Sequence, residues 1–331
     1  MTNLSALLSR FGGVYLLPVA LALLAFVLIG QPSSWVTLTV AGLAMGMMIF
    51  LMASGLSLIF GLMDVLNFGH SAFVSFGAFV AASVLAALGS WVTGGSVALN
   101  ALALLAAVGA ATAFGAVGGW FFERVIVKPV YRDHLRQILI TMGALIVAEQ
   151  LILAVWGGAP VAVPRPAFLT GSIVIGDVAI EIYRIFAFSL GLAVYVVMHY
   201  ALNRTRIGLL IRAGVENGEM VEALGYRIRR LFVGVFVAGS ALAGLGGAMW
   251  GLYQEVVTAA IGGQVVVLVF IVIIIGGLGS VGGCFVGALL VGLTANYVGF
   301  LAPKVALGSN ILLMALVLLW RPQGLYPVAK R

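Results

Sequence analysis

Residues 35–62 read WVTLTVAGLAMGMMIFLMASGLSLIFGL and contain no charged side chain. A helix needs about 20 mostly apolar residues to cross roughly 30 Å of hydrocarbon, so this stretch predicts a membrane-crossing helix. Nine further apolar runs lie at 14–30, 68–90, 97–121, 136–156, 182–202, 231–253, 264–277, 281–301 and 309–320. The runs at 264–277 and 309–320 are short for a full crossing, so eight to ten spans fit the sequence. We predict an all-α membrane protein, a polytopic helical bundle of about ten transmembrane segments that forms one domain over residues 1–331.

The composition excludes a water-soluble fold. Of the 331 residues, 63% are hydrophobic and 8% are charged, and the mean hydropathy is +1.22. Soluble domains carry about 25% charged residues. Cys284 is the only cysteine, so the chain has neither a disulfide framework nor a cysteine metal cluster.

The basic residues predict the orientation of the chain. When the amino terminus is placed inside and ten spans are threaded, fourteen Lys and Arg residues fall on the inner side and three on the outer side. The inner set is Arg10, Arg124, Lys128, Arg132, Arg136, Arg204, Arg206, Arg212, Arg227, Arg229, Arg230, Arg321, Lys330 and Arg331, and the outer set is Arg165, Arg184 and Lys304. Lys and Arg collect in cytoplasmic loops, so both termini are expected in the cytoplasm. The net charge of +7 then reflects topology and does not indicate nucleic-acid binding.

Two loops are long enough to carry a function. Residues 157–181 contain three prolines and are expected to form an irregular periplasmic surface. Residues 203–230 are highly charged, with apolar residues at roughly helical spacing, and we expect one or two short cytoplasmic helices there. The six tryptophans fall near predicted span ends, where indole rings prefer the membrane interface.

The glycine motifs do not indicate a nucleotide site. Gly277, Gly279 and Gly282 spell G-x-G-x-x-G, but a dinucleotide fingerprint also needs an acidic residue about 20 positions later, and the last acidic residue is Glu255. A phosphate loop of the type G-x-x-x-x-G-K-[ST] does not occur, so any ATP is bound and hydrolysed by partner chains. We therefore expect no enzyme activity, cofactor or metal in this chain, and we interpret Gly276, Gly277 and Gly279 as a tight bend or a gate.

Polar residues inside apolar runs are candidates for a translocation path, because each ionisable group costs about 2.5–3.5 kcal/mol to insert. Asp64, Asn67 and His70 follow at three-residue steps and would share one face of a helix. Glu149 lies inside the run at 136–156. Buried hydrogen bonding is the competing explanation for both sets, and the sequence alone leaves it open.

Several motifs resemble those of the branched-chain amino-acid permeases of ABC importers. They are GLMDVLNFGHSAFVSFGAFVA at 61–81, IYRIFAF at 182–188, TRIGLLIRAGVENGEMVEALGYRIRRL at 205–231, GGLGSVGG at 276–283 and RPQGLY at 321–326. The resemblance covers roughly residues 40–325 and is specific for the family but weak for the substrate, since related permeases carry urea, amides or aromatic acids.

The resemblance implies a complex in the bacterial inner membrane. This chain would pair with a second homologous permease, or a second copy of itself, and with two cytoplasmic ATP-binding subunits and a periplasmic solute-binding protein. The loop at 203–230 would carry the helix that couples ATP hydrolysis to transport. Its coupling residues would be Glu216, Glu219, Met220, Leu224 and Gly225.

Two other classes of function compete with an importer subunit. An ion-coupled secondary transporter would use intramembrane acids, for which Asp64 and Glu149 are the candidates. A structural or assembly protein of the membrane would need neither transport nor an ATPase partner. The charged stretch at 212–225, which resembles a docking segment, favours the importer.

Overall fold

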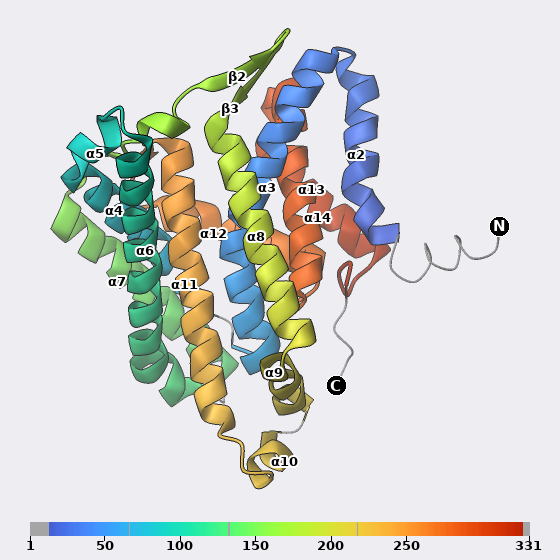
Figure 1. Cartoon of the computed structure of the whole chain (residues 1–331). Coiled ribbons are helices and arrows are strands. Elements are labelled where there is room, and N and C mark those ends of the chain that lie inside the picture. Colours follow the sequence, from blue (N-terminus) through green and yellow to red (C-terminus); the bar gives the residue numbers. More distant parts are fainter. Residues whose placement is uncertain (1–12, 66, 132, 217, 327–331) are drawn as a thin grey trace.

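Each of the ten predicted segments is a helix in the computed structural model, which describes residues 13–65, 67–131, 133–216 and 218–326. Seven helices in this part of the chain are long and apolar enough to cross a membrane, and three apolar helices are shorter. The long ones are α3 (Pro32–Met63), α4 (His70–Ala87), α6 (Val97–Phe122), α7 (His134–Trp156), α8 (Ile182–Arg204), α11 (Ile228–Gln254) and α13 (Val281–Leu301). The shorter ones are α2 (Gly13–Ile29), α12 (Ile261–Gly276) and α14 (Ala306–Trp320). The prediction of an all-α polytopic membrane protein is confirmed (Figure 1).

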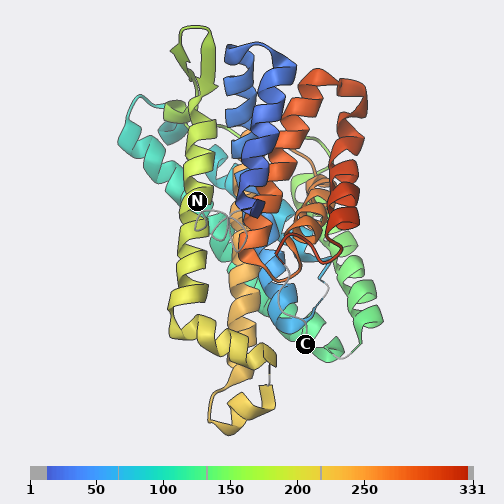
Figure 2. The same ribbon diagram turned by 90° about the vertical axis from the view of Figure 1, so that its right-hand side faces the viewer.

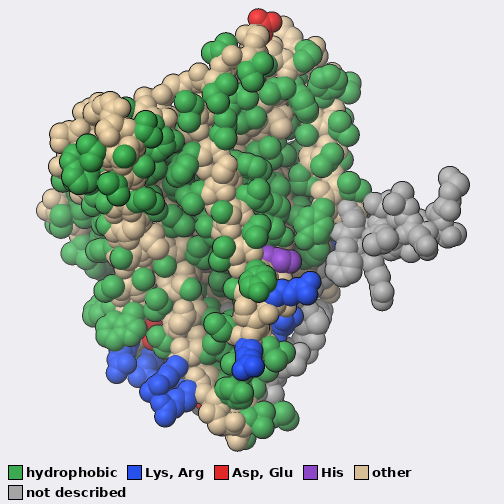
Figure 3. Space-filling view, viewed as in Figure 1, with side chains coloured by type: hydrophobic (Ala, Val, Ile, Leu, Met, Phe, Trp, Pro, Cys, Tyr) green, Lys and Arg blue, Asp and Glu red, His purple; other side chains and the backbone are tan. Residues whose placement is uncertain are grey.

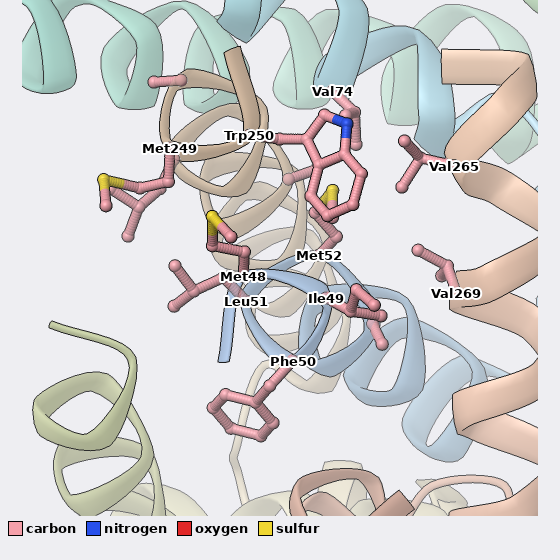
Figure 4. Close-up of a cluster of buried hydrophobic side chains, with 14 of the residues drawn as sticks. Met48, Ile49, Phe50, Leu51, Met52, Val74, Met249, Trp250, Val265 and Val269 are labelled. Atoms are coloured by element: carbon pink, nitrogen blue, oxygen red, sulfur yellow. The ribbon is translucent and has the colours of Figure 1, made fainter. Parts of the chain in front are cut away.

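Helix α3 is the centre of the bundle. The side chains of residues 47–53 are all completely buried, although a helix with one face toward lipid buries only part of its circumference. Helices α13, α11, α8 and α12 surround α3. Figure 4 shows Ile49 and Phe50 pointing to different sides of α3 into this core. The apolar run at 35–62 is therefore enclosed by other helices along much of its length.

Trp250 departs from the predicted position of the tryptophans. Its side chain is 5% exposed and packs in the core around α3, near Met52 and Val74 (Figure 4). Although Trp250 is close in sequence to the exposed end of α11 at Gln254, residues 243–252 of this helix are all buried by other parts of the protein. Proximity to the end of a helix is therefore not enough to place an indole ring at the lipid interface.

The two ends of the bundle differ in charge and structure. One end, which we call the basic end, carries the described Lys and Arg residues that were predicted to lie inside (Figure 3). Two short helices, α9 (Arg206–Glu216) and α10 (Gly218–Ala223), project there beyond the bundle, as the charged pattern predicts (Figures 1 and 2). Arg10, Arg132, Lys330, Arg331 and both chain ends lie outside the described residues.

The opposite end, which we call the hairpin end, corrects the expectation of an irregular loop. Strands β2 (Ser172–Ile175) and β3 (Val178–Glu181) form an antiparallel hairpin across the two residues Gly176 and Asp177. The short strand β1 (Val161–Ala162) pairs with β4 (Val256–Val257), which follows α11. Pairing of β-branched residues thus orders a segment whose prolines suggest irregular structure.

Short helical turns complete the connections. They are α5 (Gly89–Thr93), a π-helical turn η2 (Glu123–Val127), and the 3₁₀ turns η3 (Lys128–Val130), η4 (Ala167–Leu169) and η5 (Pro303–Val305). The loop between α7 and α8 is held at the hairpin end by Asn100, a buried residue of α6 whose Oδ1 accepts a 3.1 Å hydrogen bond from the N–H of Phe168.

Candidate functional site

Helices α4 and α12 both begin in the interior of the bundle, and their first turns touch. The N–H of Gly262, in the first turn of α12, donates to Ser75 Oγ of α4 at 3.0 Å. A β-carbon on Gly262 would overlap the carbonyl oxygen of Ser71, so only glycine allows this approach. With 16 residues, α12 is about 24 Å long, which is short of a full crossing.

The backbone between α3 and α4 re-enters the bundle. His70, the first residue of α4, places Nε2 2.9 Å from the carbonyl oxygen of Met52. Met52 precedes Met63, the last residue of α3, by 11 residues, or about 16 Å of helix. The connection therefore returns from the end of α3 to a deeper level before α4 begins. Non-helical backbone at such depth has to be shielded by protein, and Thr141 Oγ1 accepts the N–H of Phe68 at 3.2 Å.

Asn67 and His70 are buried at this junction. Asn67 has no exposed surface, and neither atom of its side-chain amide has a hydrogen-bond partner in the described part of the chain. Nδ1 of His70 is also without a partner there. Buried polar atoms are normally satisfied by protein or ordered water, so unpaired atoms at two neighbouring residues require an explanation.

Asp64 lies away from these two residues, which corrects the idea of a shared helical face. The connection is not helical, and Asp64 ends α3 in the left-handed conformation with φ of 52°. Its side chain is exposed, and Oδ2 lies 3.8 Å from Nε2 of His134 at the start of α7. Three-residue spacing puts side chains on one face only where the backbone is helical.

Glu149 of α7 lies beside the first turn of α12. Its carboxylate oxygen Oε1 is 3.3 Å from the position that a β-carbon on Gly263 would occupy. The side chain is partly buried. Glu149 therefore lies beside a helix N-terminus, a position that is electrostatically favourable for negatively charged groups. The structure thus brings Glu149, Ser71 and Ser75 to one junction between α4, α7 and α12.

The glycine-rich stretch forms a tight bend between α12 and α13. Gly277 and Gly279 have φ of +94° and +83°, which side chains with a β-carbon rarely adopt. At Gly276 a β-carbon would stand 2.5 Å from the carbonyl carbon of Gly283, so the two helices are in close contact there. A role of these glycines in gating stays a prediction.

The RPQGLY segment closes this bend. The N–H of Leu325 donates to Ile275 O at 2.8 Å, and the N–H of Tyr326 donates to Gly276 O at 3.0 Å. The last carbonyls of a helix lack partners within that helix. The end of α12 is therefore capped by a segment that lies far along the chain, and two of the motifs that resemble the permease family contact each other.

The candidate coupling residues lie on and beside α10. Leu224 is 70% exposed and Met220 is 61% exposed, and Gly225 turns the chain toward α11 with φ of +88°. The side chains of Glu216 and Glu219 lie outside the described structure. Exposed apolar side chains on a segment beyond the bundle are typical of a contact surface for another protein.

Two further polar interactions escape the sequence analysis. Glu123, in the π-helical turn after α6, is buried and accepts a hydrogen bond from the hydroxyl of Tyr131. Burial, and then the Glu123 carboxylate, raise the pKa of Tyr131. At the other end, Arg165 contacts the end of α11 across 87 residues of sequence. Neither interaction is indicated by a motif or by the spacing of its residues along the chain, and both become apparent only from the three-dimensional structure.

In the described part of the chain, ten apolar helices and polar groups buried beside helices that begin inside the bundle are features of a multi-pass membrane transport protein. The chain belongs to the family described as branched-chain amino acid transport system, permease component, whose profile matches residues 38–320. The chain is thus a transport component without an ATPase site of its own.

Curated relatives agree with this family. The high-affinity branched-chain amino acid transport system permease protein BraD of Pseudomonas aeruginosa is 28% identical over 302 residues, which cover 86% of this chain and 94% of the relative. The permease proteins LivH of Salmonella typhimurium and of Escherichia coli K12 are each 26% identical over 293 residues, which cover 86% of this chain and 92% of the relative. No solved structure matches this chain.

Proposed function

We propose that this chain is the membrane-spanning subunit of an ATP-driven importer for branched-chain amino acids in the bacterial inner membrane. A related small polar solute, such as urea, an amide or an aromatic acid, is the alternative cargo. The main support is the family match over residues 38–320, together with relatives that are named as permeases of branched-chain amino acid transport.

The partners in this proposal are chains of other kinds. Two cytoplasmic ATP-binding subunits bind at the basic end, where α9 and α10 project and Leu224 is exposed. A periplasmic solute-binding protein delivers cargo at the hairpin end. A second permease subunit, homologous or identical, completes the pathway. The excess of Lys and Arg at the basic end supports a cytoplasmic location for that end and for both termini.

The translocation path in this proposal passes the junction between α4 and α12. Asn67 and His70 have buried polar atoms without partners, and Glu149 lies at the first turn of α12. Transport sites built on interrupted helices use such polar groups at membrane depth. Asp64 is exposed and faces His134, so it contributes at the mouth of the path at the basic end.

Copurification and reconstitution test the proposal. The full chain, extracted in mild detergent with its native partners, is expected to retain two ATP-binding chains identified by mass spectrometry. In proteoliposomes the assembly is expected to take up radiolabelled leucine only with ATP and the solute-binding protein present. Uptake driven by an ion gradient without ATP would instead identify a secondary transporter, and a lone homo-oligomer without transport would contradict both transport functions.

A further inference from the structure

Arg165, in the loop between α7 and α8, caps the end of α11. Its side chain is only 11% exposed. Nε and Nη2 donate to the carbonyl oxygen of Leu252 at 3.1 and 2.8 Å, and Nη2 also donates to that of Tyr253 at 3.3 Å. The last carbonyls of a helix have no partner within the helix. One guanidinium from a distant loop therefore satisfies two of them.

The same guanidinium pairs with carboxylates from two other elements. Nη2 lies 2.9 Å from Glu255 Oε1, and Nη1 lies 3.8 Å from Glu181 Oε2. The guanidinium carbon also lies 4.7 Å from the ring centre of Tyr183, whose buried hydroxyl donates to the carbonyl oxygen of Met249. Glu255 follows α11 and Glu181 precedes α8, so one side chain joins the loop, α8 and α11.

Backbone contacts connect this loop to the start of α12. The N–H of Val163 donates to Glu255 O at 2.8 Å, and Val161 pairs with Val257. Residues 255–260 then lead from the hairpin end to the first turn of α12, where the N–H of Ile261 donates to Thr258 O at 3.0 Å. The loop that holds Glu255 therefore also sets the position of the first turn of α12 against α4.

We infer that Arg165 is a positioning residue that holds residues 255–260, and with them the first turn of α12, against α4 beside the candidate path. The inference rests on the proposed function, because the junction of α4 and α12 is a path only in a transporter. Without Arg165, the carboxylates of Glu181 and Glu255 lose their shared cation and the α11 carbonyls lose their donors. Residues 255–257 then keep only their backbone pairing with residues 161–163, so the segment that leads to α12 moves away from α4 more readily. All the contacts of the guanidinium are made by the single side chain of Arg165, so its replacement removes them together.

The geometry requires arginine and not merely a positive charge. The guanidinium presents five N–H donors in one plane. Here its three nitrogens contact two carbonyl oxygens of α11 and the carboxylates of Glu255 and Glu181. A lysine ammonium is a compact group and cannot reach carbonyls and carboxylates on different sides at once. Arg165→Lys is therefore expected to open the structure nearly as much as Arg165→Ala, although it keeps the charge.

A cysteine-accessibility experiment tests this inference on the full chain in proteoliposomes. Cys284 is buried, and Cys284→Ala removes it to give a background without thiols. Ala259→Cys then places a reporter in a partly buried position between Glu255 and α12. The measured quantity is the rate of labelling by a membrane-impermeant maleimide added at the hairpin end.

Arg165→Ala and Arg165→Lys are each expected to accelerate labelling about tenfold, because each removes hydrogen bonds made by a charged group. The control is Arg184→Gln. Arg184 donates to the same Glu181 carboxylate at 2.9 Å, but this bond does not involve α11. Its labelling rate is expected to stay within about twofold of the parent, because the α11 carbonyls keep their donors.

Equal labelling rates of the parent, Arg165→Ala and Arg165→Lys would overturn the inference. If Arg165→Ala fails to accumulate in membranes, the labelling rates of Arg165→Lys and Glu255→Gln are measured instead. Unchanged labelling rates in both variants would overturn the inference. The assay needs neither ATP nor cargo. A failure of the importer assignment in the uptake assay is thereby distinguished from a failure of the Arg165 assignment.

Discussion

Gly61, near the end of α3, lies directly against Gly279 in the bend between α12 and α13, and a β-carbon on Gly61 would overlap the Cα atom of Gly279. On its other side the bend contacts the RPQGLY segment, since a β-carbon on Gly277 would stand 2.7 Å from the carbonyl oxygen of Tyr326. The central helix, the bend and the C-terminal segment therefore form one packed unit at the basic end. The end of α12 belongs to this unit, because the N–H groups of Leu325 and Tyr326 donate to its last carbonyl oxygens.

Gly61→Ala is expected to destabilise this unit. The added methyl group meets backbone, which cannot rotate away, and such overpacking costs about 1–3 kcal/mol of unfolding free energy. The control is Gly109→Ala in α6, where nothing lies within 4 Å of the added carbon. There alanine is expected to stabilise the helix by up to about 1 kcal/mol. Denaturation in detergent compares the two, and equal stability of the variants would contradict the observed contact.

Gly277→Ala is expected to release the C-terminal segment. Alanine at a positive φ costs about 1–2 kcal/mol, and here the new carbon also approaches Tyr326. Gly30→Ala is the matched control, because Gly30 has φ of +69° and open space around it. The amides of Leu325 and Tyr326 donate to α12, so their hydrogen exchange should accelerate in Gly277→Ala and remain unchanged in Gly30→Ala. Unchanged exchange in both variants would show that the contact is unimportant.

Asn67→Leu is expected to lower transport without lowering the stability of the protein. Asn67 is buried with both amide atoms unpaired in the described part of the chain, so an apolar side chain of similar shape should maintain the unfolding free energy or raise it by about 1–3 kcal/mol. If the amide serves a passing solute, ATP-dependent uptake should nevertheless fall. Equal uptake by the variant and the parent would place Asn67 outside the path.

Asn100→Leu is the control for that experiment. Asn100 is equally buried, but its amide is fully bonded, with Nδ2 donating to three carbonyl oxygens and Oδ1 accepting from Phe168. Its replacement leaves several polar groups without partners and should cost at least about 2 kcal/mol of unfolding free energy. The expected result is that Asn100→Leu lowers the unfolding free energy and Asn67→Leu does not.

The helices were predictable from sequence because the membrane imposes a length and composition on each of them. Even the short run at 264–277 corresponds to α12, whose start at Ile261 lies inside the bundle. The hairpin had a readable signal that proline content obscured: the β-branched runs around Gly176 and Asp177 are separated by two turn-forming residues. Predicting the hairpin required more weight on the two turn-forming residues than on the proline content of the whole loop.

The site was less predictable because it depends on depth and on contacts between distant elements. Asp64, Asn67 and His70 share a face only in a helix, and the backbone between α3 and α4 is not helical. The backbone returns to the level of Met52, and within this connection a β-carbon on Gly69 would overlap the ring of Phe122, a contact that residue spacing cannot predict. Arg165 lies in a loop with no motif, and its partners on α11 are 87 residues away.

Leu224→Asp is expected to uncouple ATP hydrolysis from transport. Leu224 directly follows α10 at the basic end, where its N–H donates to Met220 O at 3.1 Å and its side chain is 70% exposed. Loss of a hot-spot side chain costs at least about 2 kcal/mol, so with Leu224 as the proposed anchor for the ATP-binding subunits uptake should fall by more than about tenfold. ATP hydrolysis by the assembled complex should persist, because the ATPase sites belong to other chains.

Val305→Asp is the matched control for this last prediction. Val305 is 59% exposed, close to Leu224 in exposure, but lies at the hairpin end between α13 and α14. The same substitution at the hairpin end leaves the α10 surface intact, so the uptake obtained per ATP hydrolysed should stay within about twofold of the parent. Parallel loss of uptake in both variants would indicate a general effect of charge on the bundle, and would remove Leu224 from the coupling surface.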